Sequence, residues 1–560
     1  MRERTYRLLA LLALLALVAA ACGGDTGDVA ETDDPVATDT PAPDEDGTTD
    51  PAPTDDGEET TAPPEGGDDV LVYGTLNPPG SIDPAKCYDS ACSAILNNTT
   101  ESLVWFPPGS DTVEPALAEE YEVSEDGLTY TFTLREGVTF HDGSELDADD
   151  VVFSLQRSVD LNHPQGAAFL ISSIESMEAT DERTVVVTIA EPNITFLSRL
   201  NYTVAAILPS DGDAYPVPDA AIDVEDPDAA AAEADEFVNE ATIVGTGPYE
   251  MTDYQEGVSV TLERNENYWG DAPAIPTVRI QYFSDSAQLS NALTTGEVDL
   301  VLNDLAPAER TSAESAEGVA ITQSDGGRIR YLVVNVNEAP FDDVNVRRAI
   351  AATVDRQRII DEVFEGAGVP LYSMIPQAFD VNADYISDIE VPELSGTPID
   401  ITLWYPTNRY GDTEADVAET IGRSLGESGL FNVTTEGADW ASEYAPNLST
   451  GTYGLFTLGW YPDYIDPDDY IEPFYDSEDT FLGYYANPAM DELITAEQQE
   501  TDLDARAGIF DEIQQLAAED MPLIPLYEEG TTIYHSEAVG NVEATLDAAQ
   551  QLRFYVFTLG

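Results

Sequence analysis

Residues Glu114–Ser158 read EPALAEEYEVSEDGLTYTFTLREGVTFHDGSELDADDVVFSLQRS, and they contain one strand signal and one helix signal in close succession. In LTYTFTLR, large apolar residues alternate with threonines after the turn SEDG, as in a strand with one buried face. In DADDVVFSLQRSV, Asp147 is placed to cap a helix whose first turn carries Asp149 and Asp150, where the helix dipole favours anions. A strand followed by a capped helix indicates layered α and β structure.

The rest of the chain repeats this alternation. The segments DDVNVRRAIAATVDRQRII (342–360) and DLDARAGIFDEIQQLAAED (502–520) each predict a capped amphipathic helix. The segments PIDITLWY (398–405) and MPLIPLY (521–527) predict strands. Because strands and helices alternate, and no period of 20 to 50 residues is visible, we predict an α/β fold and no repeat architecture.

Charge is the unusual bulk property of this 560-residue chain. It has 21 Lys and Arg against 109 Asp and Glu, a formal net charge of −88, and Lys86 is its only lysine. Such a surface repels nucleic acid and anionic lipid headgroups, so neither is expected as a partner. Adaptation to salty surroundings and a functional use of the charge both remain open. The hydrophobic fraction, 42%, is sufficient for a core in a body of two or three lobes.

The N-terminus carries an export signal. Three arginines precede the apolar run LLALLALLALVAAAC, which is short for a membrane span and stops at Cys22. Small residues before a cysteine resemble the bacterial lipoprotein signal, so we expect residues 1–21 to be removed and Cys22 to carry the lipid. An ordinary secretory signal cut nearby is the alternative. Residues 22–69, rich in Asp, Glu, Thr and Pro, predict a disordered tether that holds the folded body outside the cytoplasmic membrane.

Cys87 and Cys92, in KCYDSAC, are the other two cysteines of the chain. In an exported protein, two cysteines this close predict a local disulfide. A metal pair is the alternative, but two thiols without a nearby histidine or third cysteine fall short of the four ligands of structural zinc.

Several segments together resemble one family: the extracytoplasmic solute-binding proteins of ABC importers, in the peptide/nickel (oligopeptide- and dipeptide-binding) class. Besides the stretch quoted first, they are SIDPAKCYDSACSAILNNTTESLVWF, VGTGPYEMTDY, RNENYWG, ALTTGEVDLVL, YLVVNVNEAPFDDVNVRRAIAATVDRQRI, LGWYPDYIDPDDYIEPFY, YANPAMDELITAE and MPLIPLY. The resemblance implies a periplasmic-binding-protein-like α/β fold with a hinge. Its parts would be lobe I at 70–326 with a subdomain inserted at about 114–240, lobe II at 331–527, and a return to lobe I at 528–560.

The resemblance also implies a function without catalysis, metal or cofactor. The protein would be a monomer that encloses a short peptide between its lobes and delivers it to the transmembrane subunits of an ABC permease. The same fold binding another solute, such as an oligosaccharide or a metal chelate, stays open, and so does a secreted hydrolase.

The stretch GWYPDYIDPDDY (459–470) is the main candidate site. A calcium loop of the EF-hand type would need a glycine at the sixth place and a glutamate at the twelfth, and neither is present. In peptide-binding members of the family, the residue that matches Asp463 holds the α-ammonium group of the ligand, a bond that contributes roughly 1.5–3 kcal/mol. Trp460 and Tyr461 would line the cleft, and the remaining aspartates would form turns and solubilise the loop. Alternatively, Asp463 caps a turn and Trp460 is core.

Further candidates come from the same resemblance. Arg409 and Tyr410, in LWYPTNRYGD, match in type an Arg that binds the C-terminal carboxylate of the ligand and a Tyr near it, although a surface salt bridge is an equal alternative. Trp440 resembles the aromatic residue that packs on bound peptide, with core packing as the alternative. Tyr88 and Asp89 match the segment of lobe I that faces the ligand.

One motif points elsewhere. GRSLG, around Ser424, fits the G-x-S-x-G pattern of serine hydrolases, which requires a strand, a sharp turn and a helix. It lies inside the helix-like run ADVAETIGRSLGESG, so we expect a plain helix. His141, His163 and His535 are the only histidines, a poor supply for a catalytic triad or a nickel site.

Overall fold

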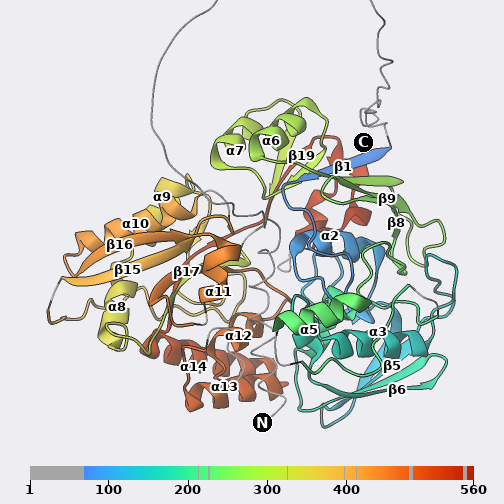
Figure 1. Ribbon diagram of the computed structural model, residues 1–560, viewed down its shortest axis with the longest axis horizontal. Coiled ribbons are helices and arrows are strands. Elements are labelled where there is room, and N and C mark those ends of the chain that lie inside the picture. Colours follow the sequence, from blue (N-terminus) through green and yellow to red (C-terminus); the bar gives the residue numbers. More distant parts are fainter. Residues whose placement is uncertain are drawn as a thin grey trace, which may run out of the picture.

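The computed structural model describes residues 69–560 except 212–213, 225–226, 325, 397, 411–412, 449, 478–482 and 547–550. The predicted signal peptide at 1–21, the lipid-carrying Cys22 and all of the predicted tether except Asp69 lie outside the described residues. In the part that is described, no helix is both long and apolar enough to cross a membrane. The chain forms two bodies that lie side by side (Figure 1).

The first body contains a seven-stranded sheet with the order β12-β19-β11-β1-β10-β9-β8. Its strands come from both ends of the described chain, because β19 inserts between β11 and β12. The strands are β1 (Val70–Thr75), β8 (Tyr249–Gln255), β9 (Ser259–Arg264), β10 (Thr277–Tyr282), β11 (Leu300–Leu302), β12 (Val319–Gln323) and β19 (Thr532–Ser536). Its helices include α2 (Ser90–Thr99), α6 (Ser286–Thr295) and α7 (Pro307–Glu314).

A four-stranded antiparallel sheet, β4-β5-β7-β6, forms a separate layer of the first body. Its strands are β4 (Ala118–Val123), β5 (Thr129–Leu134), β6 (Ile174–Asp181) and β7 (Thr184–Ile189), and α3 (Ala148–Leu161) packs against them (Figure 1). The strand and helix predicted from the opening stretch are confirmed. Alternate residues of β5 are buried, and Asp147 caps α3 in a reciprocal capping box with Asp150. The short helices α4 (Phe196–Arg199) and α5 (Pro227–Ala234) follow.

The second body is built on a six-stranded sheet with the order β14-β18-β13-β17-β15-β16. The strands are β13 (Arg328–Val334), β14 (Val369–Pro370), β15 (Ile399–Pro406), β16 (Phe431–Ala438), β17 (Leu455–Trp460) and β18 (Leu523–Glu529). The helices are α8 (Val344–Thr353), α9 (Arg356–Val363), α10 (Glu414–Glu427), α11 (Ala445–Asn447), α12 (Glu472–Tyr475), α13 (Pro488–Gln499) and α14 (Leu503–Asp520). The strands predicted at 398–405 and 521–527 are confirmed as β15 and β18.

The two helix predictions in the second body have different outcomes. The prediction of a single helix at 342–360 is wrong, because the chain forms α8 and α9 there. Val354 is extended, with ψ 123°, and the side chain of Asp355 accepts a hydrogen bond from the backbone of Arg358 and so starts a new helix. The helix predicted at 502–520 is confirmed as α14, and Phe510 and Ile513 are buried in its core-facing side.

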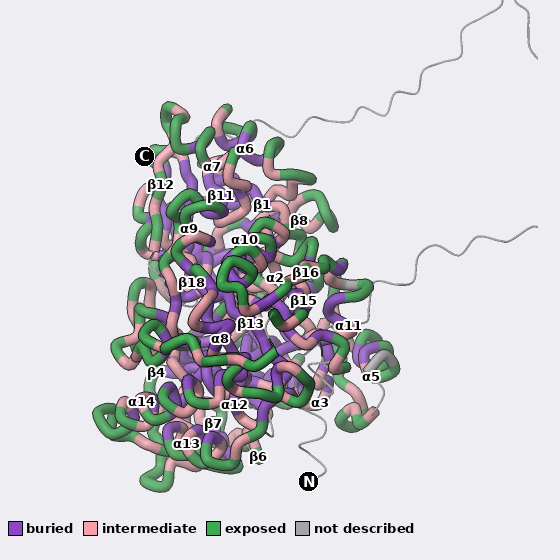
Figure 2. Tube along the Cα trace, turned by 90° about the vertical axis from the view of Figure 1, so that its left-hand side faces the viewer, coloured by how far each residue is buried: buried purple, intermediate pink, exposed green. Residues whose placement is uncertain are grey.

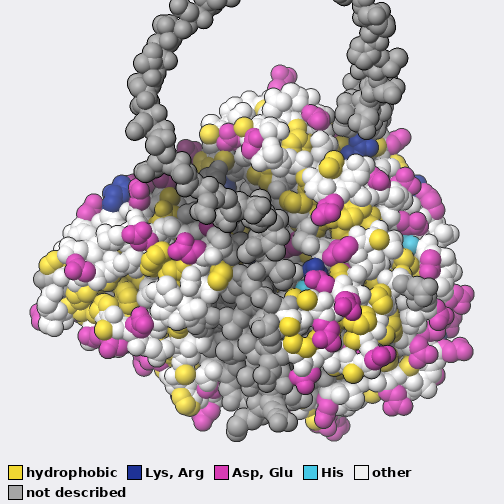
Figure 3. Space-filling view, viewed as in Figure 1, with side chains coloured by type: hydrophobic (Ala, Val, Ile, Leu, Met, Phe, Trp, Pro, Cys, Tyr) yellow, Lys and Arg dark blue, Asp and Glu magenta, His cyan; other side chains and the backbone are white. Residues whose placement is uncertain are grey.

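Within the described residues the chain passes between the two bodies twice, at 324 and 326–327 and at 530–531, and the two crossings touch. The backbone of Ser324 donates a hydrogen bond to the carbonyl of Thr531 over 2.9 Å. A Cβ on Gly530 would lie 1.9 Å from the carbonyl oxygen of Ser324, so only glycine allows this approach. Buried residues concentrate inside the molecule and exposed ones on the outer turns (Figure 2). Acidic side chains are spread over the visible face of both bodies, with few basic ones between them (Figure 3).

Candidate functional site

The acidic loop, Gly459–Tyr470, connects the end of β17 to a short 3-10 turn at Pro467–Tyr470. Pro462 and Pro467 cannot donate backbone hydrogen bonds, so the strand cannot continue through this segment. Asp466 caps the 3-10 turn by accepting a hydrogen bond from the backbone of Asp468. The loop therefore leaves the sheet of the second body and carries its aspartates toward the first body.

Asp463 lies where the two bodies meet. Its Oδ2 accepts a hydrogen bond of 2.9 Å from the hydroxyl of Tyr88, which belongs to the first body. Its backbone N–H donates to Oδ2 of Asp469 over 3.1 Å. The residue is 7% exposed, so this carboxylate joins the two bodies through a neutral donor and has little contact with water.

Asp469 is a second buried carboxylate beside Asp463. Its Oδ2 also accepts a hydrogen bond of 3.1 Å from the indole Nε1 of Trp460. Its Oδ1 is buried and accepts no hydrogen bond within the described part of the chain. Among the described residues, neither Asp463 nor Asp469 forms an ion pair.

The pKa values of both carboxyl groups are raised. Burial raises the pKa of Asp463 to about 7, although the hydrogen bond from Tyr88 and the charge of Arg199 oppose the shift. Burial, and then the charge of Asp463, raise the pKa of Asp469 well above its ordinary value. Two adjacent carboxylates in a site of low dielectric cannot both be ionised without a compensating cation.

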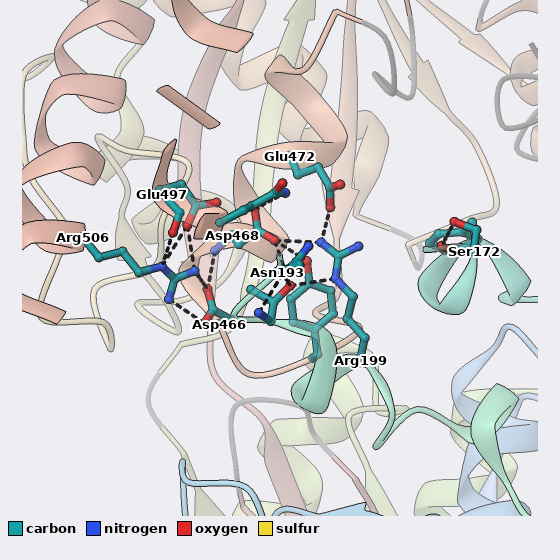
Figure 4. A network of polar contacts seen from close by, with 12 residues as sticks. Ser172, Asn193, Arg199, Asp466, Asp468, Glu472, Glu497 and Arg506 are labelled. Atoms are coloured by element: carbon teal, nitrogen blue, oxygen red, sulfur yellow. Dashed lines mark hydrogen bonds and ion pairs between the residues drawn. The ribbon is translucent and has the colours of Figure 1, made fainter. Parts of the chain in front are cut away.

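Arginines balance the other aspartates of the loop (Figure 4). Arg199, at the end of α4 in the first body, donates from Nη2 to Oδ2 of Asp468 over 2.8 Å and also to Glu472. Burial opposes ionisation of Asp468, but the charges of Arg199 and Arg506 and hydrogen bonds with Glu497 and Tyr464 together outweigh it and lower the pKa of that carboxyl. Arg506 of α14 contacts Asp466 through two parallel bonds of 2.9 and 2.8 Å. The Arg199 contact therefore joins the two bodies, whereas the Arg506 contact lies within the second.

Arg409 and Tyr410 follow β15 in the second body. The Arg409 guanidinium lies 4.9 Å from the ring centroid of Trp440, and the ring of Tyr410 contacts the same indole edge-on. The hydroxyl of Tyr410 accepts a hydrogen bond of 3.1 Å from the backbone of Gly459. This bond fixes the wall formed by Arg409, Tyr410 and Trp440 to the start of the acidic loop. Arg409 is exposed and, within the described chain, forms no ion pair. Cation–π contact with Trp440 holds it while leaving its N–H donors available.

Trp460 and Tyr461 differ in exposure. Trp460 is partly buried and packs edge-on against Phe474, with ring centroids 5.0 Å apart. Tyr461 is 42% exposed, and the buried guanidinium of Arg330 lies 5.6 Å from its ring centroid. The Arg330 guanidinium also lies 4.1 Å from the ring centroid of Tyr410, so this one cation packs against the rings of both Tyr410 and Tyr461.

Tyr88 and Asp89 precede α2 in the first body. Asp89 caps that helix, because its Oδ1 accepts a hydrogen bond of 2.7 Å from the backbone of Cys92. Its Oδ2 accepts another, of 3.0 Å, from the backbone of Gly80. Cys87 and Cys92 form a disulfide with Cα atoms 5.9 Å apart. Asp89 and the disulfide thus hold the loop from which Tyr88 reaches Asp463.

The serine hydrolase motif is part of a helix. Ser424 lies within α10, and its hydroxyl donates to the carbonyls of Ile421 and Thr420 three and four residues earlier. A nucleophile elbow needs a strand and a sharp turn before the serine, and this segment has neither. The three histidines make their hydrogen bonds in the first body, whereas α10 belongs to the second.

The sequence-based interpretation of the remaining aspartates is wrong for two of them. Asp468 is fully buried and Asp469 is 1% exposed, so neither solubilises the loop. The sequence alone carried a weak signal, since four aspartates within seven residues exceed what turns need. No sequence signal identified Arg199 or Arg330, because a long side chain reaches partners that are distant along the chain.

A surface hollow of about 1010 Å³ lies elsewhere, on the first body, and is lined by Leu76, Tyr282 and Gln288 among others. It includes none of the predicted site residues. The candidate site is therefore defined by its charged groups and by the contacts that join the two bodies, which lie closely apposed in this conformation.

Comparison with known proteins gives concordant matches. A sequence profile described as "Bacterial extracellular solute-binding proteins, family 5 Middle" matches residues 112–481. The dipeptide-binding protein of Pseudomonas aeruginosa is 28% identical over 502 residues, covering 83% of this chain and 90% of that protein. Heme-binding protein A of Haemophilus influenzae is 27% identical over 494 residues, covering 82% and 87%.

A solved structure supports the fold. The periplasmic binding protein DppA from Helicobacter pylori, in complex with the peptide STSA, superposes with a TM-score of 0.72 at 23% identity, covering 88% of this chain and 98% of that one. The predicted periplasmic-binding-protein-like α/β fold is confirmed. The profile spans well over half of the chain, and the chain therefore belongs to the bacterial extracellular solute-binding proteins of family 5.

Proposed function

We propose that this protein is a lipid-anchored receptor without catalytic activity that captures short peptides between its two bodies and delivers them to an ABC permease. One observation carries the peptide assignment: Asp463 and Asp469 form a buried acidic pair between the bodies that has no basic partner among the described residues. Relatives named dipeptide-binding protein support the same ligand class.

The acidic pair suits the amino end of a peptide. An α-ammonium group is a compact cation with three N–H donors, and it needs anionic acceptors when it is removed from water. Asp463 offers the oxygen that Tyr88 does not occupy, and Asp469 lies directly beside it. Each charge-assisted hydrogen bond in such a place contributes roughly 1.5–3 kcal/mol.

The wall that carries Arg409 suits the other end of the peptide. The Arg409 guanidinium is exposed above Trp440, and no described carboxylate forms an ion pair with it. A guanidinium binds a terminal carboxylate through two parallel hydrogen bonds. Tyr410 and Tyr461, both supported by Arg330, would pack against the peptide between its two ends.

Ligands retained by the purified protein, identified by mass spectrometry, test the proposal most directly. We expect short peptides with free termini. Trialanine should raise the melting temperature, whereas N-acetyl trialanine, which lacks the ammonium group, should not. If no peptide is retained and no member of a peptide library raises the melting temperature, the peptide assignment is wrong.

The same experiment tests the alternative of another solute. Relatives include a protein named heme-binding protein A, so a retained tetrapyrrole, metal chelate or oligosaccharide would replace the peptide as ligand. An Arg409→Gln variant separates the two ends of the peptide. We expect it to lose roughly 1.5–3 kcal/mol of affinity for trialanine and little for trialanine amide, which has no terminal carboxylate.

The lobe and anchor assignments belong to this proposal. Lobe I would comprise residues 70–326, with its inserted subdomain at about 114–240, together with 528–560; lobe II would comprise 331–527. The crossings that touch at Ser324 and Thr531 would act as the hinge. Lipid on Cys22 would hold the receptor at the outer face of the cytoplasmic membrane, and a Cys22→Ala variant should then appear in the soluble extracytoplasmic fraction.

A further inference from the structure

Two carboxylates, not one, occupy the place proposed for the ligand amine. The backbone N–H of Asp463 and the indole N–H of Trp460 both donate to Oδ2 of Asp469, over 3.1 Å each. These bonds hold the two carboxyl groups next to each other, and both residues are more than nine-tenths buried. Oδ1 of Asp469 is buried and lacks a hydrogen-bond partner in the part of the chain that is described.

We propose that Asp469 sets the charge of the amine subsite, so that the acidic pair takes up one proton from solvent when it binds a singly charged amine. The inference rests on the proposed function, because it assumes that the amine of a peptide enters this subsite. It assigns to Asp469 a specificity role distinct from that of Asp463: Asp463 binds the ammonium group, and Asp469 makes binding depend on a proton.

Charge balance in the closed site calls for this proton. Two ionised carboxylates carry two negative charges, and one ammonium group neutralises one of them. A remaining buried charge is expensive in a site closed to water, and protonation of the pair removes it. The proton moves from solvent to a carboxylate oxygen, the O–H bond forms there, and no other bond changes. The partnerless Oδ1 of Asp469 is a suitable acceptor for that proton.

The charged groups nearby do not supply the missing positive charge. Arg199 is the cation that acts on Asp463, but it donates to Asp468 and Glu472. Arg506 bonds to Asp466 and Glu497. The other titratable side chains that face the pair are neutral tyrosines and one further carboxyl group. They are Tyr88 before α2, Tyr202 near α4, and Tyr464, Asp468 and Tyr470 in the acidic loop; beyond them, Asp89 faces Tyr202 and Glu528 faces Tyr470.

The raised pKa values of Asp463 and Asp469 agree with uptake of a proton on binding. Burial raises the pKa of Asp463 to about 7 and that of Asp469 well above its ordinary value. When the bodies part, water reaches the pair and both pKa values return toward about 4. When the bodies close on a ligand at intermediate pH, the acidic pair therefore binds a proton. The affinity for peptide then falls as pH rises, by up to about tenfold for each pH unit between about 5 and 7.5. The peptide amine, with a pKa of about 8, stays mostly protonated throughout that range.

Asparagine at position 469 provides a matched variant. Its side-chain oxygen can still accept from Trp460 and from the backbone of Asp463, and its amide nitrogen would take the place of the partnerless oxygen. One carboxylate then faces one ammonium group, so the charges balance without a proton. Glu101→Gln is the control, because Glu101 is another carboxyl whose pKa is raised by burial to about 7, held by Trp269, Tyr268 and Thr246 away from this site.

Isothermal titration calorimetry with trialanine, at pH 6.5 in two buffers with different heats of ionisation, measures the protons bound per peptide. We expect a value near one for the wild type and for Glu101→Gln, and near zero for Asp469→Asn, whose affinity should vary less than threefold between pH 5 and 7.5. Asp469→Ser, checked by circular dichroism, serves if Asp469→Asn fails to fold. Trialanine binding without proton uptake by the wild type, or unchanged uptake by a folded 469 variant, overturns the inference. Absence of any peptide binding overturns instead the proposed function on which it rests.

Discussion

The acidic loop has two halves that balance their charge in different ways. In the paired half, Asp466 bonds to Arg506 and Asp468 bonds to Arg199. In the open half, Asp463 and Asp469 contact only neutral donors among the described residues: the hydroxyl of Tyr88, the indole of Trp460 and one backbone N–H. All four carboxyl groups lie within seven residues of chain, so their difference comes from what surrounds them.

The comparison distinguishes charges that serve the fold from charges that serve a ligand. A buried carboxylate that has an arginine partner stabilises the closed structure once it is formed, and losing the partner is costly. A buried carboxylate without such a partner costs stability, and the chain retains it only if an external cation compensates. The two halves should therefore respond in opposite ways to substitution and to pH.

Arg506→Ala, in the paired half, should have the largest effect. Arg506 is 6% exposed and bonds to both Asp466 and Glu497, so its removal leaves buried carboxylates without a cation. We expect the free energy of unfolding, measured with urea, to fall by roughly 3–5 kcal/mol.

A partly exposed arginine supplies the control for that measurement. Arg358 pairs with Glu362 and Glu427 at the surface, and Arg358→Ala should lower the free energy of unfolding far less than Arg506→Ala does. Equal losses in the two variants would show that burial of the paired half contributes nothing.

Asp463→Ala, in the open half, should affect binding and spare the fold. The variant leaves a peptide ammonium group without its carboxylate, so affinity for trialanine should fall by roughly 2–5 kcal/mol in calorimetry. The free energy of unfolding should stay the same or rise, because one of two adjacent buried carboxylates is removed.

Asp504→Asn is the matched control, since Asp504 is an exposed aspartate in the first turn of α14. It should alter neither quantity by more than about 0.5 kcal/mol. Unchanged peptide affinity in Asp463→Ala would remove this residue as the amine anchor and with it the distinction between the two halves.

Arg199→Ala should have a smaller effect, on closure. Arg199 is the arginine of the paired half that comes from the other body, and its bonds to Asp468 and Glu472 exist only while the bodies are together. We expect trialanine to bind about 1.5–3 kcal/mol more weakly and the radius of gyration measured by X-ray scattering without ligand to increase. Arg199→Lys, which keeps the charge, should recover part of the affinity. A variant that binds and closes like the wild type would make this contact incidental.

Local signals in the sequence were sufficient for much of the fold. The alternation in β5, the aspartate cap of α3 and the apolar face of α14 are each determined by residues close together in the chain, and each is confirmed. The break at Val354 was missed because Asp355 continues an amphipathic pattern, and only its capping bond reveals a second helix. The insertion of β19 between β11 and β12 depends on a pairing across more than 200 residues, which no local pattern encodes.

The candidate site was less accessible from the sequence. Asp463 was singled out through a family resemblance, whereas Asp469, two residues after the second proline of the loop, looked like an ordinary turn residue. Its burial and its adjacency to Asp463 follow from how the loop packs between the bodies. Arg199 lies 269 residues from Asp468 in the sequence, so the balance of charge that separates the two halves appears only in three dimensions.

The smallest expected effect concerns pH, and its sign differs between the halves. Asp463 has a folded pKa of about 7, above its unfolded value of about 3.9, so its contribution to stability is present below pH 4 and is lost as pH rises to 7. Asp468 has a lowered pKa, so its contribution is present above about pH 4 and is lost as pH falls.

Urea unfolding of the ligand-free protein at pH 4.5 and 7.5 measures both contributions. At pH 7.5 the free energy of unfolding of Asp463→Asn should exceed that of the wild type by on the order of 1 kcal/mol. The gain is no larger because water that reaches the open cleft removes most of the shift in the pKa of Asp463. Asp468→Asn should instead lose stability at both values and more at pH 7.5, because Arg506, in the same body, then lacks the charge of that carboxylate. Parallel pH curves for the two variants would mean that Asp463 and Asp468 share one electrostatic environment, against the division of the loop into a paired and an open half.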